Sequence, residues 1–166
     1  MNEKFVLAVY VDNKAGVLTR VSAMFTRRGF NIDAITSGET DILEYSRITI
    51  SMNGDEYVRE QIINQLKKLH VVKKVQVLDD DSIQRELMLI KVRNKAKDRS
   101  EIMTAVDVFR ANVIDYSPEA MCIEVTGSPS KMDAFVKLMQ PFGILEMCRT
   151  GIVALDRGAT TLLNKQ

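Results

Sequence analysis

The sequence predicts an α+β protein built from two halves, each with the element order βαββαβ. Alternating apolar residues predict the strands, and apolar stripes at helical spacing predict the helices. The same order of elements recurs after an acidic run near the middle of the chain. A half of this kind forms a four-stranded antiparallel sheet with helices on one face, so we expect two ferredoxin-like domains.

The first half is predicted to begin with a strand over residues 5–11, where apolar side chains alternate. An apolar stripe over residues 17–25 then predicts a helix. Gly29 follows, and glycine is the residue type that most often ends a helix. Residues 30–36 are the second predicted strand.

Residues 47–52 alternate between apolar and polar side chains, which predicts a strand with one face open to solvent. Asp55 precedes an apolar stripe over residues 58–69 and is a suitable cap for the start of that helix. Residues 71–78 are the fourth predicted strand and complete the first half.

The second half repeats this order without obvious residue identity to the first. Its predicted strands are residues 86–92, 112–116, 121–126 and 143–148. Its helices carry apolar stripes over residues 102–109 and 132–139. Ser128 followed by Pro129 predicts the start of the second of these helices.

The acidic run Asp79-Asp80-Asp81-Ser82 marks the expected domain boundary. The predicted division is a first domain over residues 1–78, a linker over 79–84, a second domain over 85–158 and a loose tail over 159–166. Both domains are small, so each is expected to complete its burial at an interface, which predicts an oligomer.

Composition and charge argue against several classes of function. Of 166 residues, 46% are hydrophobic, which suits a packed core. The 23 basic and 22 acidic residues leave a net charge of +1, so we expect neither nucleic acid nor an anionic membrane as a partner. The chain has no apolar run of membrane-spanning length, and its start lacks the layout of a signal peptide.

The cysteines indicate a reducing compartment, so we expect a cytoplasmic protein. Cys122 and Cys148 lie far apart in sequence without metal-binding spacing, and both are expected to be free thiols. Their segments could form neighbouring strands, so a disulfide between them stays open at this point.

The sequence offers no cluster of residues for catalysis or for a metal site. His70 is the single histidine and is expected to cap a helix or lie at the surface. The acidic run at residues 79–82 lacks the alternating ligands and central glycine of a calcium loop. Residues 47–52 lack the aromatic side chains with which a sheet of this type stacks RNA bases.

One turn has the chemistry of a ligand site. Residues 12–18 connect the first predicted strand to the first helix, whose unpaired N–H groups can accept a carboxylate. Gly16 permits close approach of a ligand, and Asn13 offers both a donor and an acceptor, which suits a zwitterion. By itself this pattern also fits an ordinary strand-to-helix turn.

The turn belongs to a longer resemblance. The segment DNKAGVLTRV, residues 12–21, resembles the first-turn signature of ACT domains, which are ligand-sensing modules of βαββαβ order. The segment RRGFNI, residues 27–32, resembles the acetolactate synthase small subunit in particular. Further matching segments are residues 46–50, 65–69, 85–92, 109–115, 131–135 and 149–158. The resemblance covers nearly the whole chain, except the last eight residues.

This resemblance implies a regulatory, non-catalytic subunit of acetolactate synthase in branched-chain amino-acid biosynthesis. Such a subunit binds and activates a catalytic large subunit and confers feedback inhibition by valine or a related amino acid. It implies that thiamine diphosphate, magnesium and FAD belong to the catalytic partner and that this chain holds no cofactor.

The resemblance also implies which residues bind the effector. Two ACT domains pair side by side in a homodimer, and the amino acid binds between them. One chain supplies Asn13, Gly16, Val17 and Leu18, and the other supplies residues 31–32. The last two are Asn31 and Ile32. Val17 would add bulk to the site if its side chain faces the ligand.

Two alternatives remain at this point. A stand-alone ACT sensor for another enzyme is disfavoured because the second half also matches the family. An enzyme of the same fold with an unrecognised site is disfavoured because the chain lacks an acid–base or metal cluster.

Overall fold

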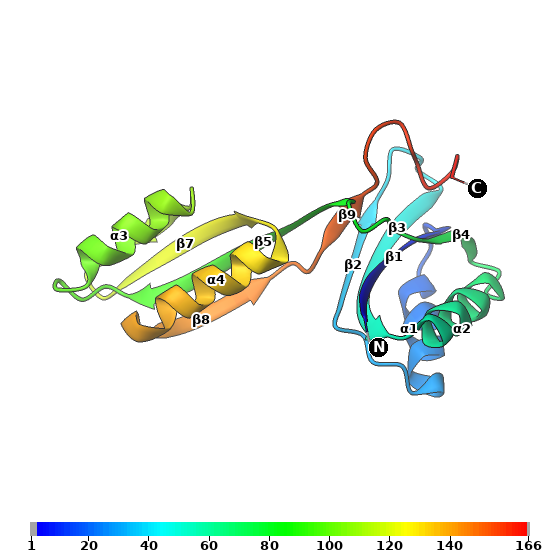
Figure 1. The fold of residues 1–166 in the computed structure, drawn as a ribbon, viewed down its shortest axis with the longest axis horizontal. Helices are drawn as coiled ribbons and strands as arrows, with labels where there is room; N and C mark the ends of the chain where they lie inside the picture. Colours follow the sequence, from blue (N-terminus) through cyan, green and yellow to red (C-terminus); the bar gives the residue numbers. More distant parts are fainter. Residues whose placement is uncertain (1–2, 166) are drawn as a thin grey trace. The chain divides into compact units, whose positions relative to one another are not determined.

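The computed structural model describes residues 3–165, and Met1, Asn2 and Gln166 lie outside the described residues. The described residues form two compact units. The first unit comprises the residues up to Ile83 together with those from Ile152 onward, and the second comprises Gln84–Gly151. Figure 1 shows that each unit contains a sheet with its helices on one face. The prediction of two ferredoxin-like domains is confirmed.

The first unit has the predicted βαββαβ order. Its elements are β1 (Glu3–Asp12), α1 (Val17–Arg28), β2 (Ala34–Glu39), β3 (Tyr45–Gly54), α2 (Glu56–Lys67) and β4 (Val72–Val77). The sheet is antiparallel with the strand order β2-β3-β1-β4. The central strand β1 is therefore hydrogen-bonded on both sides.

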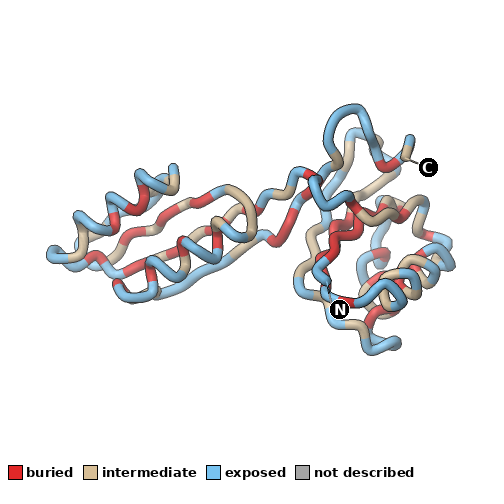
Figure 2. Tube along the Cα trace, viewed as in Figure 1, coloured by how far each residue is buried: buried red, intermediate tan, exposed pale blue. Residues whose placement is uncertain are grey.

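The main core of the first unit lies between this sheet and its two helices. The apolar residues that β1 directs at the helices are all buried, namely Phe5, Leu7, Val9 and Val11. Figure 2 shows buried positions concentrated on the strands and on one side of each helix. Local caps fix the helix ends, since Gly29 is left-handed with φ 70° after α1 and the Asp55 side chain accepts from the N–H of Val58 at 2.8 Å.

The second strand starts four residues later than predicted, at Ala34 instead of residue 30. The chain leaving α1 is still bound to that helix, because the N–H of Phe30 donates to the carbonyl of Phe25 at 3.1 Å. The rings of Phe25 and Phe30 also pack edge to face at 6.5 Å. Sheet bonding begins only where the N–H of Asp33 donates to the carbonyl of Ser51 at 3.0 Å.

The face of β3 that was predicted to meet solvent is instead buried. Thr49 is 5% exposed and Ser51 is 2% exposed. A second apolar cluster covers this side of the sheet, and its buried members are Val6, Ala8, Leu78, Ile152, Ala154 and Leu162. The covering residues come from the end of the chain (Figure 1).

The structural division of the chain therefore differs from the one predicted from the sequence. The sequence predicts that residues 152–158 belong to the second domain, whereas they group with the first unit. The sequence predicts a loose tail over residues 159–166. In the described part of that segment Leu162 is 4% exposed, and Lys165 donates to two carboxylates.

The second unit has the same order of elements. They are β5 (Ile83–Arg93), α3 (Arg99–Val108), β6 (Asn112–Tyr116), β7 (Ala120–Gly127), α4 (Pro129–Met139), a 3-10 turn (Gln140–Phe142) and β8 (Ile144–Arg149). The strand order is β6-β7-β5-β8. The short strand β9 (Val153–Leu155) belongs to the first unit. As predicted, Ser128 caps α4, and its side chain accepts from the N–H of Lys131 at 3.3 Å.

The strand order also decides the cysteine question for a single chain. Cys122 on β7 lies opposite Lys91, and Cys148 on β8 lies opposite Leu89, so β5 stands between the two thiols. Strands two apart are separated by about 10 Å, which exceeds the Cα separation that a disulfide can bridge. Both cysteines are free, and the expectation that they could occupy neighbouring strands is wrong.

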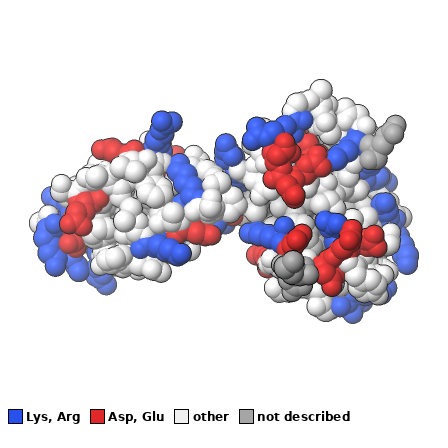
Figure 3. Space-filling view, in the orientation of Figure 1, with Lys and Arg blue, Asp and Glu red and all other residues white. Residues whose placement is uncertain are grey.

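Among residues 3–165 the helices are all too short or too polar to cross a membrane. The visible face of each unit carries both signs of charge, with lysine and arginine side chains interspersed among carboxylates (Figure 3). This distribution agrees with the small net charge of the chain.

Candidate functional site

The predicted site begins at the turn between β1 and α1. Gly16 is the residue before α1 and has φ 81° and ψ −3°, a left-handed conformation that glycine adopts without strain. A Cβ atom added at Gly16 would meet nothing within 4 Å. Glycine is therefore needed here for its backbone conformation, and the space above the turn is open to a ligand.

The first turn of α1 presents free amide groups to this open space. Gly16 has no side chain to cap the helix, and the first turn holds no acidic residue. Among the described residues, no backbone carbonyl accepts from the N–H groups of Leu18 and Thr19. Such N–H groups, together with the helix dipole, favour a negatively charged group.

Asn13 holds the turn against the loop between β2 and β3. Its backbone N–H donates to the carbonyl of Glu44 at 2.8 Å, and its Nδ2 donates to the carbonyl of Leu43 at 3.1 Å. Its Oδ1 accepts from the Ser46 hydroxyl at 2.9 Å. The side chain thus has a structural role in this chain, and one Nδ2 hydrogen and one Oδ1 lone pair remain for a ligand.

Val17 and Leu18 have opposite surroundings. Val17 is 6% exposed and belongs to the main core, so its side chain faces the core and does not add bulk to the open space above the turn. Leu18 is 46% exposed and is the apolar side chain that the turn offers to a ligand or partner. Only the backbone of Val17 is available for binding.

Within one chain, Asn31 and Ile32 lie at the opposite end of the sheet from this turn. The turn follows Asp12, which pairs with Tyr45, whereas residues 31–32 precede Ala34, which pairs with Ser51. Six residues of β3 separate the two ends, which corresponds to about 20 Å. Asn31 is exposed, and Ile32 is half-buried against the main core. One chain therefore does not bring the predicted site residues together.

The carboxylate at the start of the turn, that of Asp12, is paired with a lysine. Asp12 pairs with the Lys73 ammonium at 3.0 Å, and this hydrogen bond holds the pKa of Asp12 below its ordinary value. Lys14, within the turn, lowers the same pKa further through its charge. The local field therefore does not oppose a ligand carboxylate.

His70 is exposed, which confirms the predicted alternative of a surface histidine. Its Nε2 lies 3.0 Å from Nη1 of Arg20 on α1. An arginine only donates, so His70 Nε2 accepts this hydrogen bond. The pair ties α1 to the turn that follows α2.

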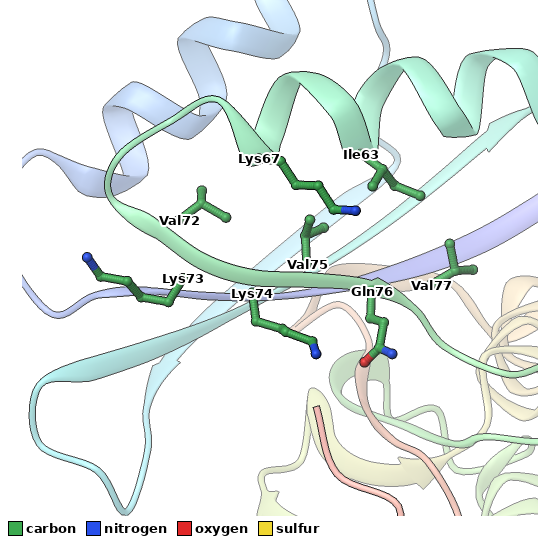
Figure 4. A pocket seen from close by; sticks show the side chains of 8 residues that line it. All are labelled: Ile63, Lys67, Val72, Lys73, Lys74, Val75, Gln76 and Val77. Carbon is green, nitrogen blue, oxygen red and sulfur yellow. The ribbon is translucent and has the colours of Figure 1, made fainter. Parts of the chain in front are cut away.

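Two surface hollows in the first unit lie away from the predicted residues. One, of about 440 Å³, lies between α1 and the turn after α2 and is lined in part by Arg20, Arg27 and His70. The other, of about 520 Å³, lies between α2 and β4. Figure 4 shows Val72, Val75 and Val77 facing α2, and Lys74 and Gln76 on the other side of the strand. Within residues 3–165, no group of histidine, cysteine and carboxylate side chains is arranged to hold a metal.

Sequence reasoning missed the residues that support Asn13. Leu43, Glu44 and Ser46 belong to a segment that the sequence marks only as a polar loop and the edge of a strand. They contact Asn13 across thirty residues or more, because β3 folds back along β1. A pattern among residues close together in the sequence cannot predict such a contact.

Known proteins similar to this chain share both of its halves. A family model described as an AHAS small subunit-like ACT domain matches residues 7–74, and one described as the small subunit of acetolactate synthase matches residues 85–158. The acetolactate synthase small subunit of Mycobacterium bovis is 47% identical over 153 residues, which are 92% of this chain and 91% of that protein. The probable acetolactate synthase small subunit of Archaeoglobus fulgidus is 46% identical over 155 residues, or 93% and 98% of the two chains.

A solved structure agrees with these sequence matches. The crystal structure of the acetolactate synthase small subunit from Thermotoga maritima superposes with a TM-score of 0.88 at 41% identity. The match covers 95% of this chain and 99% of that one. The match of the second half removes the alternative of a stand-alone ACT sensor. In this family the cofactors of the reaction belong to the catalytic subunit. The chain therefore belongs to the acetolactate synthase small subunits, the regulatory and non-catalytic partners of the catalytic large subunit in branched-chain amino-acid biosynthesis.

Proposed function

We propose that this subunit senses a branched-chain amino acid, valine or a close relative, at the turn between β1 and α1. The observation that carries the proposal is the left-handed Gly16 at the start of α1, with open space above it. The ligand carboxylate binds the free N–H groups of Leu18 and Thr19. The ammonium group of the ligand donates to the remaining lone pair of Asn13 Oδ1.

The apolar side chain of the effector contacts Leu18. This residue is exposed in the described chain although it is large and apolar, and a branched aliphatic ligand is a suitable partner for it. Val17 contributes only its backbone, because its side chain is buried. We infer that Leu18, and not Val17, is the residue that selects among valine, leucine and isoleucine.

The complete site belongs to a homodimer. Asn31 and Ile32 lie about 20 Å from the turn in their own chain, so they serve the turn of a second copy. Paired first domains would bring the start of one α1 to the segment before β2 of the partner. The polar side chain of Asn31 is exposed in the single chain and is free to complete such a site.

We further propose a division of labour between the two units. The first unit carries the effector site, and residues 85–151, the part of the predicted second domain that lies in the second unit, help to bind and activate the catalytic subunit in the cytoplasm. Effector binding then biases the complex towards its less active state. The change in activity is limited by the difference in the effector's affinity for the two states.

A panel of amino acids tests the effector assignment. The melting temperature of the full chain is measured with valine, leucine, isoleucine, and with alanine and threonine as controls. A ligand that binds only the folded protein stabilises it and so raises its melting temperature. At a ligand concentration one hundred times the dissociation constant, the stabilisation is about 2.7 kcal/mol. If none of the branched-chain amino acids shifts the transition and the controls behave alike, the proposed site is wrong.

Mixed dimers test whether the site is shared between chains. Gly16→Asp and Asn31→Ala each damage every site in their own homodimers. A mixed dimer instead contains one site with an intact Gly16 from one chain and an intact Asn31 from the other. Unfolding and refolding the two variants together should restore up to half of the binding sites of the mixed dimers, counted by calorimetry. No recovery in dimers shown to be mixed would contradict a shared site.

A further inference from the structure

The last residues of the chain cover the face of the first sheet that its helices leave open. Ile152, Ala154 and Leu162 are each at most 6% exposed. They form the second apolar cluster with residues of β1 and the residue after β4, which are Val6, Ala8 and Leu78. We refer to residues 152–165 as the strap.

Polar contacts fix the strap to the edge of the same unit. The Lys165 ammonium donates to Asp79 at 2.7 Å and to Asp156 at 3.1 Å, and these carboxylates raise its pKa. The N–H of Asp79 donates to the carboxylate of Asp156 at 3.1 Å, and Lys74 on β4 donates to the carbonyl of Lys165 at 2.8 Å. The end of the strap is thus held by charged groups from the strap itself, β4 and the segment after it.

Arg47 joins the strap to the middle of the sheet. Its Nη2 donates to the carbonyl of Ala154 at 2.7 Å, and its guanidinium lies 5.8 Å from the centroid of the Tyr10 ring. Tyr10 in turn stacks on Tyr45 at 6.1 Å. Arg47 lies opposite Tyr10 in the pairing of β3 with β1, so this contact lies on the face that the strap covers.

The same short stretch of β3 also holds the turn of the effector site. Ser46 is the neighbour of Arg47 and donates to Asn13 Oδ1 at 2.9 Å. Glu44, two residues earlier, accepts from the backbone N–H of Asn13 at 2.8 Å. The Glu44 carbonyl and the Ser46 side chain therefore bind the turn, and the side chain of Arg47, on the other face of β3 from Ser46, binds the strap.

We propose that the strap and the Asn13 turn are coupled through Arg47, so that docking of the strap stabilises the conformation of the turn that binds the effector. The functional meaning of this coupling rests on the effector site proposed above. Thermodynamic linkage requires the reverse effect as well, in which effector binding tightens the docking of the strap. Arg47 acts here as a positioning residue and does not touch the ligand.

The coupling follows from the shared strand. Adjacent residues of β3 direct their side chains to opposite faces, so a shift of its backbone at residues 46–47 moves both sets of contacts. Loss of the Ala154 hydrogen bond releases one of the restraints on this stretch. A hydrogen bond to a charged donor contributes about 1.5 kcal/mol, or about tenfold in an equilibrium constant.

Hydrogen exchange on the full-length chain without ligand tests the coupling. The pair Leu162→Ala and Leu163→Ala offers a matched control, because Leu162 is 4% exposed and Leu163 is 52% exposed. We expect Leu162→Ala, but not Leu163→Ala, to speed exchange of the Asn13 and Tyr45 amides by about fivefold or more. In the Arg47→Ala background the same change should have little further effect, while Arg47→Lys should retain part of the coupling.

A strap that only covers apolar surface would give a different result. Leu162→Ala would then speed exchange along β1 and the strap and leave the turn unchanged, or would act equally with and without Arg47. Either outcome overturns the proposal. If Leu162→Ala prevents folding, Leu162→Val takes its place.

A second measurement adds the ligand to the same variants. The valine affinity of Leu162→Ala should fall by about fivefold or more relative to Leu163→Ala, and valine should slow exchange of strap amides in the unmodified chain. Equal affinities in the two variants would overturn the coupling. Failure of the unmodified chain to bind valine would refute the effector site instead, and the ligand-free exchange would still decide whether the strap and the turn are coupled.

Discussion

Replacement of Gly16 by aspartate, with asparagine as its control, separates binding from folding at the effector site. Gly16 is left-handed, and both Asp and Asn tolerate that conformation better than other side chains. A Cβ at this position meets nothing within 4 Å, so neither variant collides with the fold. The two substitutions have nearly the same shape and differ in charge.

The expected change in stability is small. The left-handed conformation costs a non-glycine residue about 1 kcal/mol. An aspartate or asparagine side chain before α1 regains about 1 kcal/mol by accepting from the first-turn N–H groups, which no side chain caps at present. The free energy of unfolding should therefore stay within about 1 kcal/mol of that of the unmodified chain in both variants, measured by urea denaturation.

The expected change in binding is large and depends on charge. Both side chains compete with the ligand for the same N–H groups, and aspartate also repels its carboxylate. Two like charges about 4 Å apart repel by about 1 kcal/mol in water and about 4 kcal/mol near a protein surface. Gly16→Asp should thus bind valine about fivefold to several hundredfold more weakly than Gly16→Asn.

Calorimetric titration at low and high salt measures this difference. Added salt screens exposed charges, so the gap between the two variants should narrow as the salt concentration rises. Equal affinities of the aspartate and asparagine variants at low salt would show that no ligand carboxylate lies at the start of α1. Unchanged affinity in both variants would move the site away from Gly16 altogether.

Three further predictions concern both units. Val17→Ala should lower the free energy of unfolding by roughly 2 kcal/mol, measured by urea denaturation. Leu18→Ala should change that free energy by no more than about 0.5 kcal/mol, and titration should show weaker or less selective amino-acid binding. Arg149→Met should destabilise the second unit by about 3–5 kcal/mol in urea, because it leaves the buried Glu86 carboxylate without its partner. The pKa of Asp12 is lowered in the folded chain, so its contribution to stability is present above about pH 4 and is lost as the pH falls through the folded value; Asp12→Asn should flatten that part of the stability profile in acid denaturation.

Most of the fold is predictable because its signals are local. The apolar alternation of β1, the stripe of α1 and the caps at Gly29, Asp55 and Ser128 each involve residues within a few positions of one another. A side chain that caps a helix acts on a backbone N–H three residues away, so the sequence contains the whole interaction.

Two of the failures depend on distant parts of the chain. Thr49 and Ser51 are polar and alternate with apolar residues, and only the strap, about one hundred residues later, makes their face buried. The strand order of the second sheet, which separates Cys122 from Cys148, likewise has no local signal. These features require knowledge of which segments meet in space.

The effector site lies between these two cases. The Gly16 turn has a local pattern, and the structure gives glycine there a conformational reason. Val17 belongs to the apolar stripe of α1, which predicts a core position, and its side chain is buried in the main core. The hydrogen bonds that fix Asn13 come from residues 43–46 and could not be anticipated from the turn.

The return of the chain to its first unit also bears on how the protein is made. The first 83 residues leave the ribosome early, but their sheet gains its second cover only when residues 152–165 emerge. Domains usually fold in order of synthesis, from the N-terminus onward. Here the second unit is in effect an insertion and can finish first, while the unit that was started first waits with Val6 and Ala8 uncovered until residues 152–165 emerge.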